Sequence, residues 1–377
     1  MQRFLFLLVF LAACTQRTPT APPALTATSA AATATANILA PTPTPAVLSG
    51  SHSPHTQTPT PLPSTPTPPP LTLGYIATGA GTLGVLPAVE AAAQSNGWLV
   101  AQAADPTGDG LRALVAQGIA VLVADGPEFE AVARESAAGN PSLYVIGLGH
   151  AGTEGDLPNL LALGGPLSRE DQLGFMAGVV TGYLTEGRVV TAIANPTTAV
   201  GAKYRNGYLH GVRYACSRCR VDFIDLADEN ATAFAAERAA LNAQLSSDVV
   251  FAAAWPAGEA GLQAAAGVGA WVVGAGGDLY VSAFENGAAP GADRVVTSAY
   301  FDAGAAVQTA LAGYVAGVPP AGAQPFSAAN GAVALAPYRV SEDVLSELDR
   351  QEIAAVLARL ADGSLDTGIN PLTGDEL

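Results

Sequence analysis

Three side chains that could bind a ligand follow apolar runs typical of β-strands. Trp255 follows the run 249–253, Asp278 follows the run 270–273 after two glycines, and Asp125 closes an earlier run. The carboxyl ends of parallel strands share one edge of a sheet, and ligands bind outside that edge. A carboxylate there can accept hydrogen bonds from two neighbouring hydroxyl groups, and a tryptophan can stack on a ring.

Each of these positions also has a plain structural interpretation. Asp278 could serve as a turn or cap residue after its two glycines, and Trp255 could be a core tryptophan beneath a turn. Asp125 could cap the helix that follows it. Phe301 could line the same pocket or begin a buried helix face. The sequence alone leaves these alternatives open for all four residues.

A glycine-rich turn after the first predicted strand offers a second kind of site. Gly79, Gly81 and Gly84 have the spacing of a dinucleotide fingerprint, and Asp105 lies about twenty residues further on. The chain holds 41 glycines, so such spacing arises easily by chance, and we expect no cofactor. The N–H groups around Gly81 and Thr82 could instead hold a ligand oxygen or an anion.

Histidine and cysteine usage argues against catalysis and metal binding. After the proline-rich segment only His150 and His210 occur, and neither lies in a nucleophile-elbow or metal-ligand pattern. We therefore predict no catalytic residue, no metal site and no enzymatic activity. Cys216 and Cys219 form a C-x-x-C pair that could be redox-active or half of a zinc site. A local disulfide is the simplest interpretation in an exported protein.

The first residues have the pattern of an export signal. Arg3 precedes the apolar run 4–10, which is too short to span a bilayer and fits a signal peptide. Small residues then precede Cys14, as in a bacterial lipobox. This resemblance implies a signal peptide over residues 1–13 and a lipid on the Cys14 sulfur. We expect the protein at the extracytoplasmic face of the cell membrane.

Residues 14–71 consist mainly of Thr, Pro, Ala and Ser, a composition typical of an extended, disordered stalk. All acidic residues follow this stalk, and the whole chain carries a formal charge of −16. Lys203 is its only lysine, and no basic patch is visible. Binding of nucleic acid is therefore disfavoured, because neutralising phosphates requires clustered Lys and Arg.

Residues 72–377 alternate apolar strands with helices, which predicts an α/β fold with parallel sheets. We expect two lobes joined by a hinge around a central cleft. The first lobe is predicted at about 72–185 with a returning segment at about 294–325. The second is predicted at about 188–290 together with the C-terminal helix.

Several motifs in this part resemble the basic membrane protein family of ABC-transporter substrate-binding lipoproteins, which includes purine nucleoside receptors. They occur in the segments 171–184, 205–212, 271–278 and 296–307. The resemblance implies a type I periplasmic-binding-protein-like fold, a nucleoside-like or sugar-like ligand and an ABC permease as partner.

In the family, an aspartate at the position of Asp278 binds ribose. The turn 79–84 lacks the aromatic and amide residues of nucleoside-binding members, and Phe301 stands near an expected lysine. We therefore predict a small polar solute, with a nucleoside as one possibility. A surface sensor or interaction lipoprotein that keeps the fold without transport is the alternative.

Overall fold

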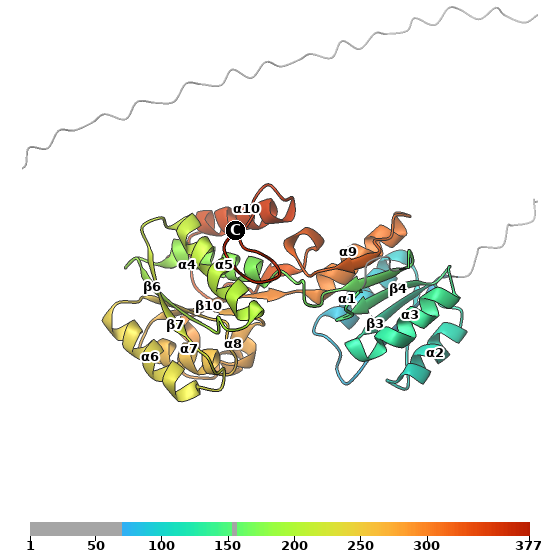
Figure 1. Ribbon diagram of the computed structural model, residues 1–377, viewed down its shortest axis with the longest axis horizontal. Helices are drawn as coiled ribbons and strands as arrows, with labels where there is room; N and C mark the ends of the chain where they lie inside the picture. The colour runs from blue at the N-terminus through green and yellow to red at the C-terminus, as the bar shows by residue number, and fades with distance from the viewer. Residues whose placement is uncertain (1–69, 153–156) are drawn as a thin grey trace, which may run out of the picture. The chain divides into compact units, whose positions relative to one another are not determined.

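The first series of strands forms one six-stranded parallel sheet in the computed structural model, which describes residues 70–152 and 157–377. The strand order is β11-β5-β4-β3-β1-β2. Figure 1 labels the inner strands β3 and β4 of this sheet. The strands are β1 (Thr72–Ala77), β2 (Leu99–Gln102), β3 (Val121–Asp125), β4 (Tyr144–Leu148), β5 (Leu160–Leu163) and β11 (Gly322–Gln324). The inner strands β3 and β4 are buried along their whole length, so the sheet needs cover on both faces.

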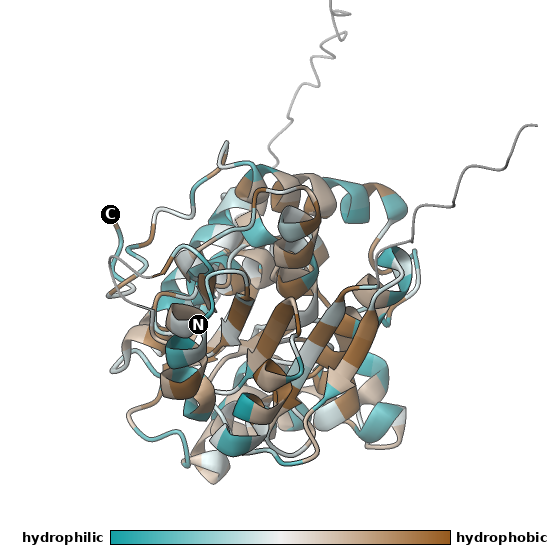
Figure 2. Cartoon of the chain, turned by 90° about the vertical axis from the view of Figure 1, so that its right-hand side faces the viewer, coloured by the Kyte–Doolittle hydropathy of each residue, from teal (hydrophilic) through white to brown (hydrophobic). Residues whose placement is uncertain are grey.

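Helices provide that cover in two layers. Helices α1 (Val85–Asn96) and α9 (Ala303–Val315) pack on one face of the first sheet. The 3-10 helix η1 (Pro127–Phe129) and helices α2 (Gly108–Ala116) and α3 (Glu130–Gly139) contribute to the core on the other face. Figure 2 shows these strands in brown between helices that carry hydrophilic residues, as expected for a sheet buried on both faces.

The second series forms another six-stranded sheet, in the order β12-β10-β9-β8-β6-β7. Its strands are β6 (Val189–Ala194), β7 (Arg220–Asp225), β8 (Val249–Ala252), β9 (Trp271–Ala275), β10 (Val295–Phe301) and β12 (Val333–Leu335). Only the edge strand β12 runs antiparallel among these described strands. The alternation of strands and helices therefore predicted the parallel sheets correctly.

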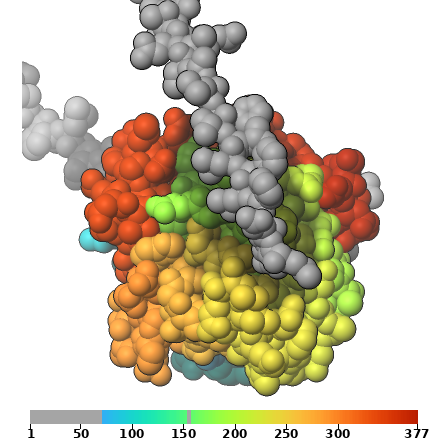
Figure 3. All heavy atoms as spheres, turned by 90° about the vertical axis from the view of Figure 1, so that its left-hand side faces the viewer, coloured from blue at the N-terminus to red at the C-terminus, as the bar shows by residue number. Residues whose placement is uncertain are grey.

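This sheet is also covered on both faces. Helices α4 (Glu170–Leu184), α5 (Ala199–Ala215) and α10 (Glu347–Ala361) form one layer. Helices α6 (Thr232–Leu245), α7 (Ala257–Gly267) and α8 (Leu279–Ser282) form the other, which Figure 3 shows in yellow and orange. The 3-10 turns η2 (Glu285–Gly287), η3 (Ala292–Arg294) and η4 (Ala328–Asn330) complete the connections.

The glycines of two predicted motifs let α4 and α5 approach closely. A Cβ at Gly178 would collide with the Tyr208 carbonyl oxygen, and one at Gly211 would collide with that of Phe175. Because Gly has no Cβ, the two backbones come into contact without strain. These glycines are therefore explained by helix packing rather than by ligand binding.

Two predicted lobe boundaries differ from the observed packing. The predicted first lobe includes the segment 168–185, but α4 packs mainly on α5 and over the second sheet. The returning segment 294–325 is divided, because β10 pairs with β9 while α9 and β11 join the first sheet. The chain thus crosses between the sheets after β5, after β10 and after β11.

Lys203 fixes the first of these crossings. Its side chain is 1% exposed, and Nζ donates hydrogen bonds to the Ser168 carbonyl oxygen at 2.8 Å and to Glu170 Oε2 at 2.6 Å. A buried ammonium is tolerated only when it is paired and hydrogen-bonded. The only lysine of the chain therefore holds the connection between β5 and α4 against α5.

Cys216 and Cys219 form a disulfide in the turn between α5 and β7. The predicted signal peptide over residues 1–13, Cys14 and nearly all of the predicted stalk 14–71 lie outside the described residues. No helix in the described part of the chain is long and apolar enough to cross a membrane.

Candidate functional site

Each sheet has a topological switch point, where successive strands are added on opposite sides of one inner strand. In the first sheet β1 lies between β2 and β3, and in the second β6 lies between β7 and β8. Parallel sheets bind ligands outside the carboxyl ends of their strands at such points. The residues that follow β1, β3, β6 and β8 are therefore the first candidates, with those after β9 and β10 beside them.

At the first edge, Asp125 ends β3 and is saturated with hydrogen bonds. It is 3% exposed and accepts bonds from the Tyr75 hydroxyl at 2.9 Å, from Thr82 N at 2.7 Å and from Thr82 Oγ1 at 2.6 Å. Burial, followed by the bond to Asp125 and its charge, raises the pKa of Tyr75, so the hydroxyl stays a donor. Asp125 thus anchors the turn after β1 rather than capping the next helix.

The same contacts argue against a dinucleotide at the glycine-rich turn. Gly81 has φ +68°, and a Cβ there would collide with the Tyr75 hydroxyl. The N–H of Thr82 is taken by Asp125, and that of Gly81 donates to the Thr78 carbonyl oxygen at 3.1 Å. A buried carboxylate beneath this turn would repel a phosphate. The predicted residues Gly81, Thr82 and Asp125 do lie together, in one closed network.

Two further groups border this edge. Thr78 Oγ1 donates to Glu128 Oε1 at 2.5 Å, which lowers the pKa of Glu128. His150 is buried, with Nε2 3.1 Å from the Gly126 carbonyl oxygen, and burial lowers the pKa of His150. A hollow of about 320 Å³ beside the turn is lined by Tyr75, Ile76, Ala77, Gly79, Ala80, Leu86, Gln102, Ala103 and Pro106.

At the second edge, Asp278 accepts fewer hydrogen bonds than Asp125 does and remains partly exposed. Its Oδ1 accepts a hydrogen bond from Tyr280 N at 3.2 Å, so it caps the short helix α8. Its Oδ2 accepts one from Arg339 Nη2 at 2.9 Å, and its side chain is 22% exposed. The guanidinium carbon of Arg339 lies 4.4 Å from the ring centroid of Tyr280. Asp278 is therefore a cap residue that keeps solvent access and acceptor capacity.

An aromatic and an amide side chain lie at the strand-order change of the second sheet. Trp255 follows β8 and is partly buried against the core, and a Cβ at Gly276 would lie 3.2 Å from its Nε1. Asn195 follows β6, donates from Nδ2 to Glu229 at 3.2 Å and accepts from the Thr197 backbone at 3.1 Å. Trp255 and Asp278 therefore border neighbouring turns of one edge, as predicted from their strand-end positions.

Phe301 serves packing in this structure. It ends β10, its ring centroid is 5.5 Å from that of Phe326, and it contacts the apolar cores of both sheets. It does not begin a helix, because α9 starts at Ala303. The ring is partly buried and packs against both cores, so it serves packing from the end of a strand rather than from a helix.

The crossing from β10 to α9 links the two edges. Asp302 caps α9 by accepting from Ala305 N at 2.9 Å, and a Cβ at Gly304 would lie 2.5 Å from the Gly84 carbonyl oxygen. Burial, and then the negative charges of Asp302 and Asp278, raise the pKa of Tyr300. The crossing therefore brings acidic groups of the second edge toward the glycine-rich turn of the first.

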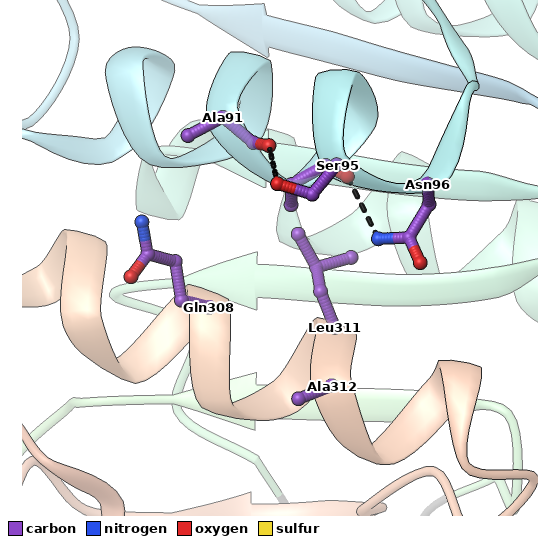
Figure 4. Close-up of a pocket in the computed structure, with 7 residues that line it drawn as sticks. Ala91, Ser95, Asn96, Gln308, Leu311 and Ala312 are labelled. Carbon is purple, nitrogen blue, oxygen red and sulfur yellow. Dashed lines mark hydrogen bonds between the residues drawn. The ribbon is translucent and has the colours of Figure 1, made fainter.

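Another hollow, between α1 and α9, has no comparable chemistry (Figure 4). The Ser95 hydroxyl donates to the Ala91 carbonyl oxygen at 2.9 Å, and Asn96 Nδ2 donates to that of Ala92 at 2.8 Å. These residues close the end of α1 remote from the carboxyl edge. Across the described residues, no group of three or more His, Cys, Asp or Glu side chains could hold a metal ion.

Sequence reasoning did not identify Tyr75, Asn195 or Arg339. Asn195 follows β6 directly, so the strand-end rule could have found it. Arg339 gave no such signal, because its contact with Asp278 joins positions 61 residues apart.

Residues 89–360 match the model of a family described as Bmp, ABC transporter substrate-binding protein PnrA-like. The chain belongs to this family. Its members are solute-binding proteins, which act outside the cytoplasm and are not enzymes. The resemblance drawn from the sequence motifs is thereby confirmed. No match was found among curated proteins.

Solved structures agree on the fold. An ABC transporter solute-binding protein from Conexibacter woesei DSM 14684 is 20% identical, with a TM-score of 0.58 over 78% of this chain and 98% of that chain. A transcriptional activator of the comK gene from Bacillus halodurans is 15% identical, with a TM-score of 0.56 over 79% and 99%. The bilobal type I periplasmic-binding-protein-like fold is confirmed, and at these identities the likeness concerns the fold alone.

Proposed function

We propose that this protein captures a small, uncharged, hydroxyl-rich solute between the carboxyl edges of its sheets and delivers it to an ABC permease. The observation that carries the proposal is Asp278, a partly exposed carboxylate on the same edge as Trp255 in a chain of this family. A carboxylate accepts hydrogen bonds from hydroxyl groups, and an indole ring packs on a sugar or base.

Charge favours a neutral solute. Asp125, Glu128, Asp278 and Asp302 border the two edges, and Arg339 is already paired with one of them. An acidic solute would meet like charges at short range, which disfavours binding. Nucleosides and sugars both satisfy this requirement. The turn 79–84 holds no aromatic side chain, so Trp255 is the ring that we assign to stacking.

A thermal-shift screen of residues 66–377, secreted so that the disulfide forms, tests the solute class. The panel contains nucleosides, bases, neutral sugars and carboxylates. A solute at a hundred times its Kd adds about 2.7 kcal/mol to the unfolding free energy, which gives a visible shift. We expect responses to nucleosides or sugars. Responses to carboxylates alone would contradict the proposal.

The proposed location also rests on Cys14, which we propose carries a lipid that holds the protein at the extracytoplasmic face of the membrane. Replacing Cys14 with Ser should move the protein from the membrane fraction to the soluble fraction while solute binding stays unchanged. Uptake of the labelled solute should require both this protein and a permease. Binding without any effect of gene deletion on uptake would favour a sensor.

A further inference from the structure

One segment of the second sheet carries positive charge without any acidic residue. Between Glu186 and Asp222 the sequence contains no Asp or Glu, although the whole chain has 32 acidic residues against 16 Lys and Arg. Two basic residues of this segment are held by partners, Lys203 in the buried crossing and Arg205 by Asp225 at 2.8 Å. The other basic residues of the segment are exposed, namely Arg188, Arg213, Arg218 and Arg220.

The fold gathers these four arginines at the amino ends of β6 and β7. Arg188 directly precedes β6, Arg220 begins β7, and the Arg220 N–H donates to the Arg188 carbonyl oxygen at 2.8 Å. Arg218 lies in the turn that the disulfide closes just before β7, and Arg213 lies in the last turn of α5. We refer to these four residues as the basic face. It lies at the ends of the strands opposite to those where we place the solute.

The basic face keeps its charge available to a partner. Among residues 70–152 and 157–377, three of its four side chains form no ion pair, and Arg220 pairs with Asp222 at 2.9 Å while remaining 66% exposed. Asp248 lies beside the start of β6, but its Oδ2 accepts the N–H groups of Glu186 and Gly187 at 2.7 Å each. Three guanidinium groups are therefore open to an external anion.

An exposed tyrosine lies next to the basic face. Tyr214 follows Arg213 and is 42% exposed, and its hydroxyl accepts a hydrogen bond from Nη1 of Arg359 at 2.8 Å. Arg359 lies in the last turn of α10, so it adds a further cation here. Tyr214 and Arg213 line a hollow of about 430 Å³. Asp366 also lines this hollow and accepts the Gly368 N–H at 2.7 Å.

Phosphate groups match this arrangement of side chains. A guanidinium group binds phosphate through two parallel hydrogen bonds, and tyrosine is enriched at the headgroup level of bilayers. We propose that the basic face, together with Tyr214, docks the domain on an anionic phospholipid surface. The formal charge of −16 on the whole chain does not prevent this contact, because charges more than about 10 Å from the surface are largely screened at about 0.1 M ionic strength.

The proposed lipid anchor supplies the membrane, and in this respect the inference rests on the proposed function. Even fully extended, the segment 15–71 spans at most about 200 Å, so a lipid on Cys14 keeps the domain within reach of the bilayer. Docking through the basic face leaves the carboxyl edge of the second sheet uncovered, because that edge lies at the opposite ends of the strands. The domain would therefore stay near a membrane-bound permease with its proposed solute site open.

Flotation of residues 66–377 with lipid vesicles tests the inference. This segment is one compact unit that holds both sheets, so it can be studied without the predicted anchor. The vesicles contain phosphatidylcholine alone or phosphatidylcholine with about one third phosphatidylglycerol, which makes the surface anionic. We expect binding to the anionic vesicles only, weakened at least about tenfold when salt rises from about 0.05 M to about 0.5 M.

Charge-removing variants separate the basic face from net charge. Arg213→Gln combined with Arg218→Gln should weaken binding to anionic vesicles at least about tenfold, because each arginine near such a surface contributes about fivefold. The matched control is Arg112→Gln combined with Arg238→Gln, which removes the same charge from exposed positions on α2 and α6 and should leave vesicle binding unchanged. Unfolding curves establish that each double variant is folded.

The contrary outcomes are distinct from failure of the proposed function. Absence of binding to the anionic vesicles, or equal binding to both kinds of vesicle, would overturn the inference. Equal losses in the two double variants would do the same, because net charge alone would then act. Binding of a poly-glutamate peptide without binding of vesicles would assign the face to an acidic protein instead. The proposed solute site and the lipid on Cys14 would survive each of these results, because the vesicle test uses neither.

Discussion

Asp125 and Asp278 both follow strands at a carboxyl edge, yet their surroundings differ. Asp125 is buried and accepts three hydrogen bonds from Tyr75 and Thr82. Asp278 is 22% exposed and accepts bonds from Arg339 and a backbone N–H. Position at a strand end thus does not decide the role of a carboxylate. The role depends on how many hydrogen-bond donors the protein itself supplies to the carboxylate. Of the two aspartates, only Asp278 keeps exposed acceptor positions that a solute could use.

Tyrosines near the two aspartates differ in the same way. The Tyr75 hydroxyl is consumed by Asp125, whereas the Tyr300 hydroxyl has no hydrogen-bond partner among the described residues. The protein itself uses the polar groups of the first edge to hold a turn, whereas the second edge, where we propose that the solute binds, keeps unpaired polar groups. The predictions that follow test this contrast, beginning with the largest expected effect.

Removing the Asp125 carboxylate should destabilise the fold most. Asp125→Ala leaves the Tyr75 hydroxyl and the Thr82 N–H without their acceptor, and each unsatisfied buried group costs about 1–3 kcal/mol. We expect a loss of about 2–4 kcal/mol of unfolding free energy in urea denaturation. Asp125→Asn, which keeps one acceptor oxygen, should lose less. A loss below about 0.5 kcal/mol, the size of an ordinary surface effect, would remove the distinction between the edges.

Removing the Asp278 carboxylate should change binding rather than stability. Asp278→Ala breaks a partly exposed ion pair and a cap, which together amount to about 1–2 kcal/mol at most. Affinity for a vicinal-diol solute should fall at least about tenfold, or about 1.4 kcal/mol. Urea denaturation and calorimetric titration of the same preparation measure both quantities. A variant that loses more stability than Asp125→Ala would reverse the comparison.

The smallest expected effect concerns His150, whose pKa is lowered by burial. The unfolded chain therefore binds a proton at higher pH than the folded chain does. His150 contributes fully above its unfolded pKa of about 6.5, and this contribution is lost as pH falls through the lower folded value. Unfolding free energy should drop between pH 7.5 and 5.5 in the wild type, and less in His150→Gln. An equal drop in both would assign the pH dependence to other groups.

The sequence was sufficient for the fold because its signals are local. Apolar strands such as 119–123 and 249–253 alternate with helices, and this alternation defined the parallel sheets. The lobe boundaries were less accurate. The predicted returning segment 294–325 keeps β10 together with α9, but β10 pairs with β9 of the second sheet, and such tertiary pairing leaves no local signal.

Candidate site residues could be predicted from the sequence only where they follow a predicted strand. Asp125, Trp255 and Asp278 are candidates because of their positions. The hydrogen bonds of the two aspartates depend on distant partners such as Tyr75 and Arg339. No local pattern states that Asp125 is saturated and Asp278 is not. The turn 79–84 has the glycine spacing of a phosphate-binding loop. The sequence does not reveal that the Asp125 carboxylate occupies its N–H group, because Asp125 lies 43 residues from Thr82.

The central claim is that Asp278 contacts a hydroxyl-rich solute while Asp125 holds the fold. Its most direct test is calorimetric titration of one vicinal-diol solute, chosen from the screen, into wild type and Asp278→Ala. The account predicts binding by the wild type and at least about tenfold weaker binding by a variant that remains folded. Equal affinity of the two proteins, or no binding of any diol by the wild type, would contradict it.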